Sequence, residues 1–126
     1  MNNRRQSERE GRKAERRVAT YLRLRGYKVL EERFKTNYGE VDLIARKGKT
    51  LAFVEVKQRA TQRAIDESMT WRGEQRIIDS AEIWVERNFA QLPENFEMRF
   101  DFAAIIGPVS PLSRVTYLEG AFLPEQ

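Results

Sequence analysis

Small and apolar residues near the start of the chain recur at the spacing of one helical face. Between about Ser7 and Arg25 they return every three or four positions, and charged side chains fill most of the rest. The apolar face holds Gly11, Ala14, Val18 and Leu22, and the basic residues Arg12, Lys13, Arg16, Arg17 and Arg23 lie largely elsewhere. Gly26 then supplies a C-cap, because glycine adopts the positive φ that ends many helices. The pattern predicts an amphipathic helix.

Short apolar runs, which are typical of strands, follow this helix. They are YKVLEERF at 27–34 and two further runs at about 40–47 and 50–58. The pair Gly48 and Lys49 separates the last two runs, and a Gly-X pair suits a two-residue type II′ turn. The sequence therefore predicts three strands, of which the second and third form a hairpin.

The second half of the chain also alternates between helical and strand patterns. A helix from about Gly73 to Phe89 carries Ile77, Ile78, Ala81, Trp84 and Val85 on one side. The nearly continuous apolar run MRFDFAAIIG at 98–107 is typical of a covered central strand, and SRVTYLEG at 113–120 gives a last strand. Segment 60–72 reads as a polar connection.

The order of these elements predicts the fold class. The second helix can serve as a crossover, which makes the strands on either side of it parallel. We expect an α/β domain with a mixed β-sheet of about five strands, flanked by helices on both faces. A chain of 126 residues suits one such domain, at 11–120, between a basic, flexible arm at 1–10 and a tail at 121–126.

Composition narrows the possible chemistry. The chain has neither His nor Cys, which excludes histidine-based and thiolate-based catalysis and metal sites built on those ligands. An enzyme built from this sequence must use carboxylates, Lys, Arg, Tyr or a hard metal ion. No apolar run is long enough to span a bilayer, and the start lacks the apolar segment of a signal peptide, so we expect a cytoplasmic protein without a membrane partner.

The excess positive charge lies at the amino-terminal end. The formal net charge is +4, and residues 1–17 hold seven basic and three acidic residues, so the rest of the chain balances. Such a region is attracted to polyanions such as nucleic acid. The candidate contacts are Arg4, Arg5, Arg12, Lys13 and Arg16. A solvated segment that aids solubility explains the same charge.

Four ionisable residues interrupt the apolar strands of the hairpin. In the register that its turn implies, Asp42 lies opposite Glu55, and Glu40 lies opposite Lys57. All four are expected on one face, with Val41, Leu43, Val54 and Val56 on the other. Two opposed carboxylates repel each other unless a cation lies between them, either Lys57 or a divalent metal ion.

This arrangement suggests metal-dependent phosphodiester hydrolysis. Carboxylate oxygens with room for water suit Mg²⁺ or Mn²⁺. The ammonium group of Lys57 would steady the developing negative charge, and Glu40 would position that lysine. The alternative is an exposed strand face with cross-strand Glu–Lys pairs. Glu15 lies on the inward side of the first helix, where a carboxylate needs a partner, either this site or a nearby Arg.

The hairpin also carries a family resemblance. GEVDLIARKGKTLAFVEVKQR at 39–59 closely resembles the core signature of the YraN-like family of small bacterial proteins. Three further stretches resemble that family's opening helix and first strand, later helix and later strand: GRKAERRVATYLRLRGYKVLEERF, EQRIIDSAEIWV and MRFDFAAI. The resemblance runs from about Gly11 to Ile106.

That family is similar to the PD-(D/E)xK nucleases, especially to archaeal Holliday-junction resolvases. The resemblance implies a restriction-endonuclease-like core, with Asp42 and Glu55 as metal ligands and Lys57 as the catalytic lysine. It also implies a role for Glu15, as the extra acidic residue that junction resolvases carry on their first helix. Gln75 matches a polar helix residue that faces the active site, or else it projects into water.

The match has three departures. Val41 stands where the superfamily has Pro, and Glu74 stands where the family commonly has Lys. Segment 60–72 is poorly matched, so no substrate contact is carried over to it.

The leading hypothesis is a metal-dependent endonuclease that hydrolyses phosphodiester bonds in DNA, including branched or structured DNA, with Mg²⁺ or Mn²⁺ as cofactor. A homodimer would allow it to cut two strands symmetrically. One alternative is a non-catalytic nucleic-acid-binding module that retains the nuclease fold. The other is a protein-interaction scaffold.

Overall fold

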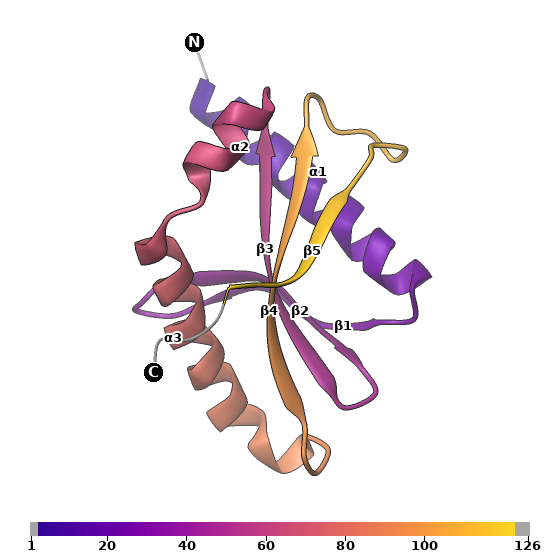
Figure 1. Ribbon diagram of the computed structural model, residues 1–126, viewed down its shortest axis with the longest axis vertical. Helices are drawn as coiled ribbons and strands as arrows, with labels where there is room; N and C mark the ends of the chain where they lie inside the picture. The colour runs from indigo at the N-terminus through magenta and orange to yellow at the C-terminus, as the bar shows by residue number, and fades with distance from the viewer. Residues whose placement is uncertain (1–2, 123–126) are drawn as a thin grey trace.

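Five strands form one mixed sheet in the computed structural model, which describes residues 3–122 (Figure 1). The elements are α1 (Asn3–Leu24), β1 (Lys28–Lys35), β2 (Glu40–Lys47), β3 (Thr50–Arg59), α2 (Gln62–Ser68), α3 (Trp71–Asn88), the 3-10 turn η1 (Phe89–Gln91), β4 (Glu97–Ile106) and β5 (Thr116–Phe122). The strands lie in chain order, and only the β3–β4 pair is parallel. The predicted α/β class is confirmed, and the architecture is consistent with a restriction-endonuclease-like core.

The β2–β3 hairpin has the predicted turn. Lys47 pairs with Thr50, and Gly48 has a φ of 62°, which a type II′ turn requires at its first position. The antiparallel pairing continues as far as Leu43 and Val54.

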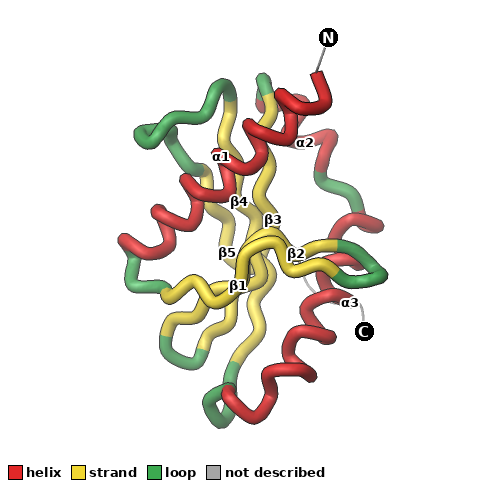
Figure 2. Tube along the Cα trace, turned by 180° about the vertical axis from the view of Figure 1, so that it is seen from behind, coloured by secondary structure: helices red, strands yellow, loops and turns green. Residues whose placement is uncertain are grey.

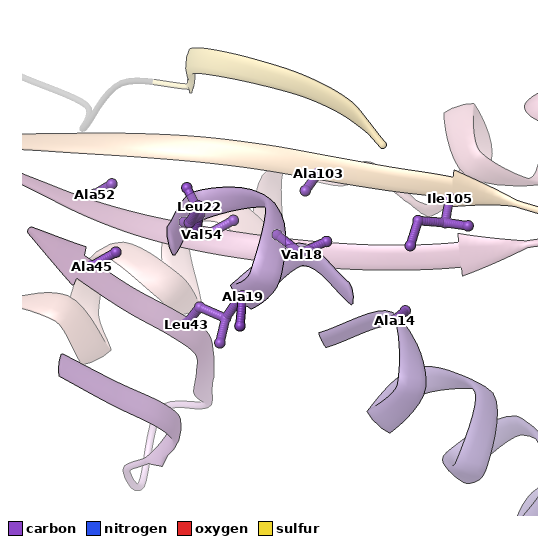
Figure 3. Packing of buried hydrophobic residues seen from close by; sticks show 10 residues of the cluster. All are labelled: Ala14, Val18, Ala19, Leu22, Leu43, Ala45, Ala52, Val54, Ala103 and Ile105. Carbon is purple, nitrogen blue, oxygen red and sulfur yellow. The ribbon is translucent and has the colours of Figure 1, made fainter. Parts of the chain in front are cut away.

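Helix α1 covers one face of the sheet, where it crosses the strands obliquely (Figure 2). Its buried residues pack against side chains from the three central strands (Figure 3). The cluster contains Ala14, Val18, Ala19, Leu22, Leu43, Ala45, Ala52, Val54, Ala103 and Ile105. The helical periodicity predicted this face of α1 because each of its buried residues lies three or four positions, or one position, from another.

Helix α3 covers the opposite face. Its apolar residues join Val41, Ile44, Leu51, Phe53 and Phe100 in a second buried cluster. Trp84 is 4% exposed, and its indole N–H donates a hydrogen bond to Glu31 at 3.2 Å. Among the helices in residues 3–122, none has the length and apolar character needed to cross a membrane.

The ends of the elements differ from the expectation in three places. Helix α1 already begins at Asn3, so residues 3–10 form its first turns rather than a flexible arm. Segment 62–68, expected as a connection, is helix α2, which Thr61 caps by accepting a hydrogen bond from the Ala64 N–H at 3.1 Å. Strand β5 runs to Phe122 and so takes in the first two residues of the expected tail. Residues 1–2 and 123–126 lie outside the described part of the chain.

Candidate active site

Strands β2 and β3 separate just beyond their last paired residues. The ladder ends at Leu43 and Val54, and the backbone N–H of Val56 donates to Oδ2 of Asp42 at 2.8 Å. The carboxylate of Asp42 therefore takes the N–H that a continuing β-ladder would have used. The two strands therefore separate at Asp42, the residue that the sequence predicted as a metal ligand.

The alternation of side chains also breaks at Asp42. Val41 packs on the α3 side of the sheet, whereas Leu43 and Val54 pack on the α1 side. The expectation that Val41 and Leu43 share a face is therefore wrong. The neighbouring strand is irregular at the same level, because Arg33, between residues paired with Leu43 and Val41, has a φ of 55°. A regular period of two cannot continue through such a position.

Three carboxylates meet at this irregularity. Glu15 from α1 and Glu40 and Asp42 from β2 each place one carboxylate oxygen within 4.8 Å of the others. The sequence predicted Glu15 and Asp42 as members of a metal site but gave Glu40 the supporting role. Glu55 lies next to this trio but is not part of it, and its negative charge helps to raise the pKa of Asp42.

The trio is electrostatically unfavourable when it holds no cation. Burial is the main cause that raises the pKa of Asp42 to about 7, and the charges of Glu15, Glu40 and Glu55 raise it further. The hydrogen bond from Val56 opposes this increase. Burial likewise raises the pKa of Glu15, and Arg33 opposes that rise from 3.7 Å away. A cation bound among these groups would relieve the repulsion.

Glu55 holds the candidate catalytic lysine. The Nζ atom of Lys57 lies 3.3 Å from Oε2 of Glu55, and the Glu55 side chain is almost fully buried. Glu40 instead lies 3.9 Å from Nζ of Lys35. The expectation that Glu40 positions Lys57 is therefore wrong, because the strands have separated before they could bring these two side chains opposite each other.

Helix α3 places Glu74 near the site. Burial raises the pKa of Glu74, and so does the charge of Glu55. Gln75, the predicted residue, donates a hydrogen bond to Asp79 of its own helix at 3.0 Å. Sequence reasoning missed Glu74 as a neighbour of the site and treated it only as a departure from the resemblance.

The basic residues predicted to bind nucleic acid lie on α1. Arg4, Arg5, Arg12, Lys13 and Arg16 are all exposed. The positive charge of Arg12 opposes the rise in the pKa of Glu15 that burial causes. The Nζ atom of Lys13 lies 3.2 Å from Oε2 of Glu10. The first helix therefore carries both the acidic residue of the trio and the predicted basic contacts.

The donor set fits a hard divalent cation. Mg²⁺ and Mn²⁺ prefer carboxylate oxygens, and the trio offers one from each of three side chains. The raised pKa of Asp42 is a second sign, because a bound cation would stabilise its ionised form. Glu15, Glu40 and Asp42 are therefore the residues best placed to hold a metal ion, with Glu55 beside them.

Arg33 provides a test of the strained backbone at this site. We expect Arg33→Gly to be more stable than Arg33→Ala by about 1 kcal/mol, because only glycine adopts a left-handed φ without steric cost. Both variants lose the contact with Glu15, so the difference isolates the backbone. Urea unfolding of the two variants measures it.

Glu32, the preceding residue of β1, is the matched control. Among the described residues other than glycine, only Arg33 and Asn95 have positive φ, so Glu32 has ordinary strand geometry. There Ala should be more stable than Gly by about 0.5–1 kcal/mol. The same order at both positions would contradict strain at Arg33.

Comparison with known proteins places the sequence of this chain in a family. The sequence model of a family described as "Uncharacterised protein family UPF0102" matches residues 14–105, a span that contains all five of Glu15, Glu40, Asp42, Glu55 and Lys57. A UPF0102 protein of Rhodopseudomonas palustris (strain BisB18) is 47% identical over 104 residues, which cover 81% of this chain and 73% of the relative.

Two further relatives give the same picture. A UPF0102 protein of Nitrobacter winogradskyi is 45% identical over 98 residues, covering 78% of this chain and 80% of the relative. One of Agrobacterium fabrum is 40% identical over 105 residues, covering 83% of this chain and 84% of the relative.

Proposed function

The chain belongs to the UPF0102 family, the YraN-like group that its hairpin resembles, and from this premise we propose that it is a metal-dependent endonuclease acting on DNA. The observation that carries the proposal is the trio of Glu15, Glu40 and Asp42 beside the Glu55–Lys57 pair. A purely structural sheet has no need to gather four acidic side chains where two strands separate. The repulsion among them is the kind of local cost that functional sites retain.

The acidic residues would hold Mg²⁺ or Mn²⁺. Asp42 would be the main ligand, because the Val56 N–H holds its carboxylate and the charges of Glu15, Glu40 and Glu55 all raise its pKa. Glu15 and Glu40 supply the remaining carboxylate oxygens of the trio. When bound, the metal ion would supply positive charge that stabilises the phosphate group as its negative charge increases during hydrolysis.

Lys57 would contribute a second positive charge from the protein itself. The Oε2 atom of Glu55 lies 3.3 Å from Nζ of Lys57 and keeps the Lys57 ammonium group in place. The Lys57 side chain is still 26% exposed. It can therefore reach a phosphate oxygen without losing its position at the site. In hydrolysis a P–O bond to water forms and a P–O bond of the backbone breaks, and Lys57 would stabilise the added charge on the phosphate.

DNA is the substrate best supported by the chain as a whole. The exposed basic residues of α1 would attract a polyanion to the same helix that supplies Glu15. The resemblance to junction resolvases favours branched or otherwise structured DNA. Two copies of the chain would suit such a substrate, since symmetric cutting of two strands is a task for a two-fold dimer.

A cleavage panel tests the proposal. With Mg²⁺ or Mn²⁺, the purified chain should cut at least one of linear, flapped and four-way DNA, and removal of the metal with EDTA should stop the reaction. Lys57→Gln should slow cleavage by about 10²–10³-fold, the usual effect of removing one group that stabilises developing charge. Gel analysis of end-labelled DNA measures both effects.

Lys49→Gln is the control for this loss. Lys49 is exposed in the hairpin turn, at the opposite end of β3 from Lys57, so its loss changes the net charge equally. Full cleavage by Lys57→Gln would point to a contaminating nuclease and would overturn the proposal. Binding of DNA without cleavage under any metal would favour the non-catalytic nucleic-acid-binding module instead.

A further inference from the structure

A groove runs along α1 on the side where the chain leaves β4. Two adjoining hollows of about 640 Å³ and about 440 Å³ lie between α1 and the segment that follows β4, and both are lined by Lys13 and Val109. Figure 2 shows this segment beside α1, at the end of the sheet where β3 and β4 finish. We call the two hollows together the α1 groove.

The α1 groove is lined by an excess of positive charge. Arg9 and Lys13 line the larger hollow, and Lys13, Arg16 and Arg17 line the smaller one. Glu10 is the acidic residue of the lining, and its charge is already partnered. It lies 3.2 Å from Nζ of Lys13 and accepts a hydrogen bond from the Val109 N–H at 3.1 Å, contacts that lower its pKa.

The walls of the groove are fixed to each other. The Nε–H of Arg17 donates to the carbonyl oxygen of Ser113 at 2.8 Å, which ties α1 to the segment after β4. The side chain of Gln58 donates to the carbonyl oxygen of Gly107 at 2.6 Å, which ties the same segment to β3. The groove therefore exists before any ligand binds.

The α1 groove lies on the side of α1 that faces away from the candidate active site. Its basic residues recur three or four positions apart along α1, so they share one side of the helix. Each residue of an α-helix turns by about 100°, which places Glu15 about 200° around the helix from Lys13, on the side that Ala14 and Val18 bury against the sheet. On β3, Gln58 of the groove and Lys57 are successive residues, so their side chains point to opposite faces of the sheet.

We propose that the α1 groove binds the phosphodiester backbone of DNA at a place separate from the phosphate at the active site. This inference rests on the proposed function and adds where the substrate lies. The partner is a chain of phosphates rather than a single small anion, because the cations are spread along two adjoining hollows instead of converging on one point. Arg9 and Arg16 are the residues best suited to contact it, since both are exposed and their side chains make no ion pair among the described residues.

The salt dependence of DNA binding tests this proposal without any cleavage. The full chain is titrated onto a fluorescent DNA duplex in EDTA at several KCl concentrations, and binding is followed by anisotropy. Each phosphate contact contributes about 0.9 to the slope of log affinity against log salt. The double variant Arg9→Gln/Arg16→Gln should therefore lose about 1.8 from the slope and bind at least about tenfold more weakly at low salt.

A second double variant, Lys28→Gln/Lys49→Gln, has the same net charge and serves as the control. Both lysines are exposed. Lys28 begins β1, and Lys49 lies in the hairpin turn just before β3, at the opposite end of that strand from Gln58 of the groove. The control should keep the slope of the original chain. Equal losses in the two variants would mean that only net charge matters and would overturn the groove, as would a failure of the original chain to bind DNA at low salt.

Because this measurement contains no metal, it separates the two proposals. If the variants show the expected difference in slope but the original chain cuts no DNA, the groove proposal is supported and the nuclease proposal is overturned. If the original chain cuts DNA but Arg9→Gln/Arg16→Gln has the same slope as the original chain, the nuclease proposal is supported and the groove proposal is overturned. Circular dichroism of each variant confirms that α1 remains helical.

Discussion

Asp42→Asn should make the folded chain more stable at pH 8 and at the same time abolish cleavage of DNA. The amide keeps an oxygen that can accept the hydrogen bond from the Val56 N–H, but it removes the negative charge from the acidic trio. A mutation that stabilises a protein while it destroys activity indicates a residue retained for function rather than for folding. Urea unfolding and the DNA cleavage panel measure the two effects.

The direction of the stability change follows from the raised pKa of Asp42. In the unfolded chain an Asp side chain loses its proton near pH 3.9, whereas in the folded chain the pKa of Asp42 is about 7. Between these values the folded chain holds a proton that the unfolded chain has released. The free energy of unfolding therefore falls as pH rises from about 4 to about 7 and stays low above that range.

The size of this effect is large for one side chain. One pKa unit corresponds to about 1.4 kcal/mol, so the ionised carboxylate of Asp42 costs the folded state on the order of 4 kcal/mol at pH 8. Asp42→Asn should recover up to that amount at pH 8 and little at pH 4. It should also remove most of the fall in stability between these pH values.

Asp66→Asn gives a matched comparison. Asp66 lies exposed on α2, where it accepts a hydrogen bond from Gln62, so the same chemical change should leave stability and cleavage nearly unaffected. Mg²⁺ should raise the melting temperature of the original chain more than that of Asp42→Asn, because a ligand stabilises only the state that binds it. A loss of stability at pH 8 in Asp42→Asn would show that the trio is not under electrostatic repulsion.

The sequence was most informative where local rules decide the structure. The Gly48–Lys49 turn set the hairpin register, and the spacing of apolar residues identified the buried faces of α1 and α3. These features depend on a few neighbouring residues, so they can be predicted without knowledge of the rest of the fold. They were sufficient to bring Asp42, Glu55 and Lys57 into one region.

The geometry within the site could not be predicted in the same way. A regular ladder was assumed to continue past Leu43, but the side chain of Asp42 competes for the Val56 N–H and the strands separate. Arg33 gives no warning of its left-handed backbone, because the pattern of apolar residues does not encode the sign of φ. The placement of Glu40 in the trio follows from these two irregularities, which explains why sequence reasoning assigned it the wrong partner.

Helix α2 was missed for a different reason. Ile65 is the one buried residue of this seven-residue helix, so the segment has too few apolar positions for a helical period to show. The available signal was Thr61, a residue type that favours the N-cap position. Tertiary contacts of Ile65 with Phe102 and Ala104 stabilise the helix, and no local pattern reports them.

Asp101→Asn should destabilise the fold by about 3–5 kcal/mol, the usual effect of removing one partner from a buried ion pair. Asp101 is 0% exposed and binds the guanidinium of Arg99 through both carboxylate oxygens, at 2.8 and 2.9 Å. It also accepts hydrogen bonds from the Tyr117 hydroxyl at 2.6 Å and the Gly120 N–H at 2.9 Å. Thermal and urea unfolding measure the loss.

These contacts explain why Asp101 carries more stability than an ordinary ion pair. The pairing of β4 with β5 is irregular between Phe100 and Phe102, and the Asp101 carboxylate takes the Gly120 N–H at that point. The Asp42 carboxylate likewise accepts a hydrogen bond from a backbone N–H where β2 and β3 stop pairing. The neighbours of Asp42 are acidic, however, whereas Asp101 is paired with the guanidinium of Arg99. The two substitutions to Asn should therefore change stability in opposite directions at pH 8.

Glu119→Gln separates the buried contact from the charge of Arg99 itself. Glu119 lies 3.6 Å from the same guanidinium, but its side chain is 62% exposed, so its loss should cost less than about 1 kcal/mol. A cost for Asp101→Asn as small as that for Glu119→Gln would mean that β5 is held by its backbone pairing alone. Asp101→Asn could also lower stability by several kcal/mol while its folded fraction cleaves DNA with the same metal dependence as the original chain. That result would mean that Asp101 supports the fold and takes no part in the active site.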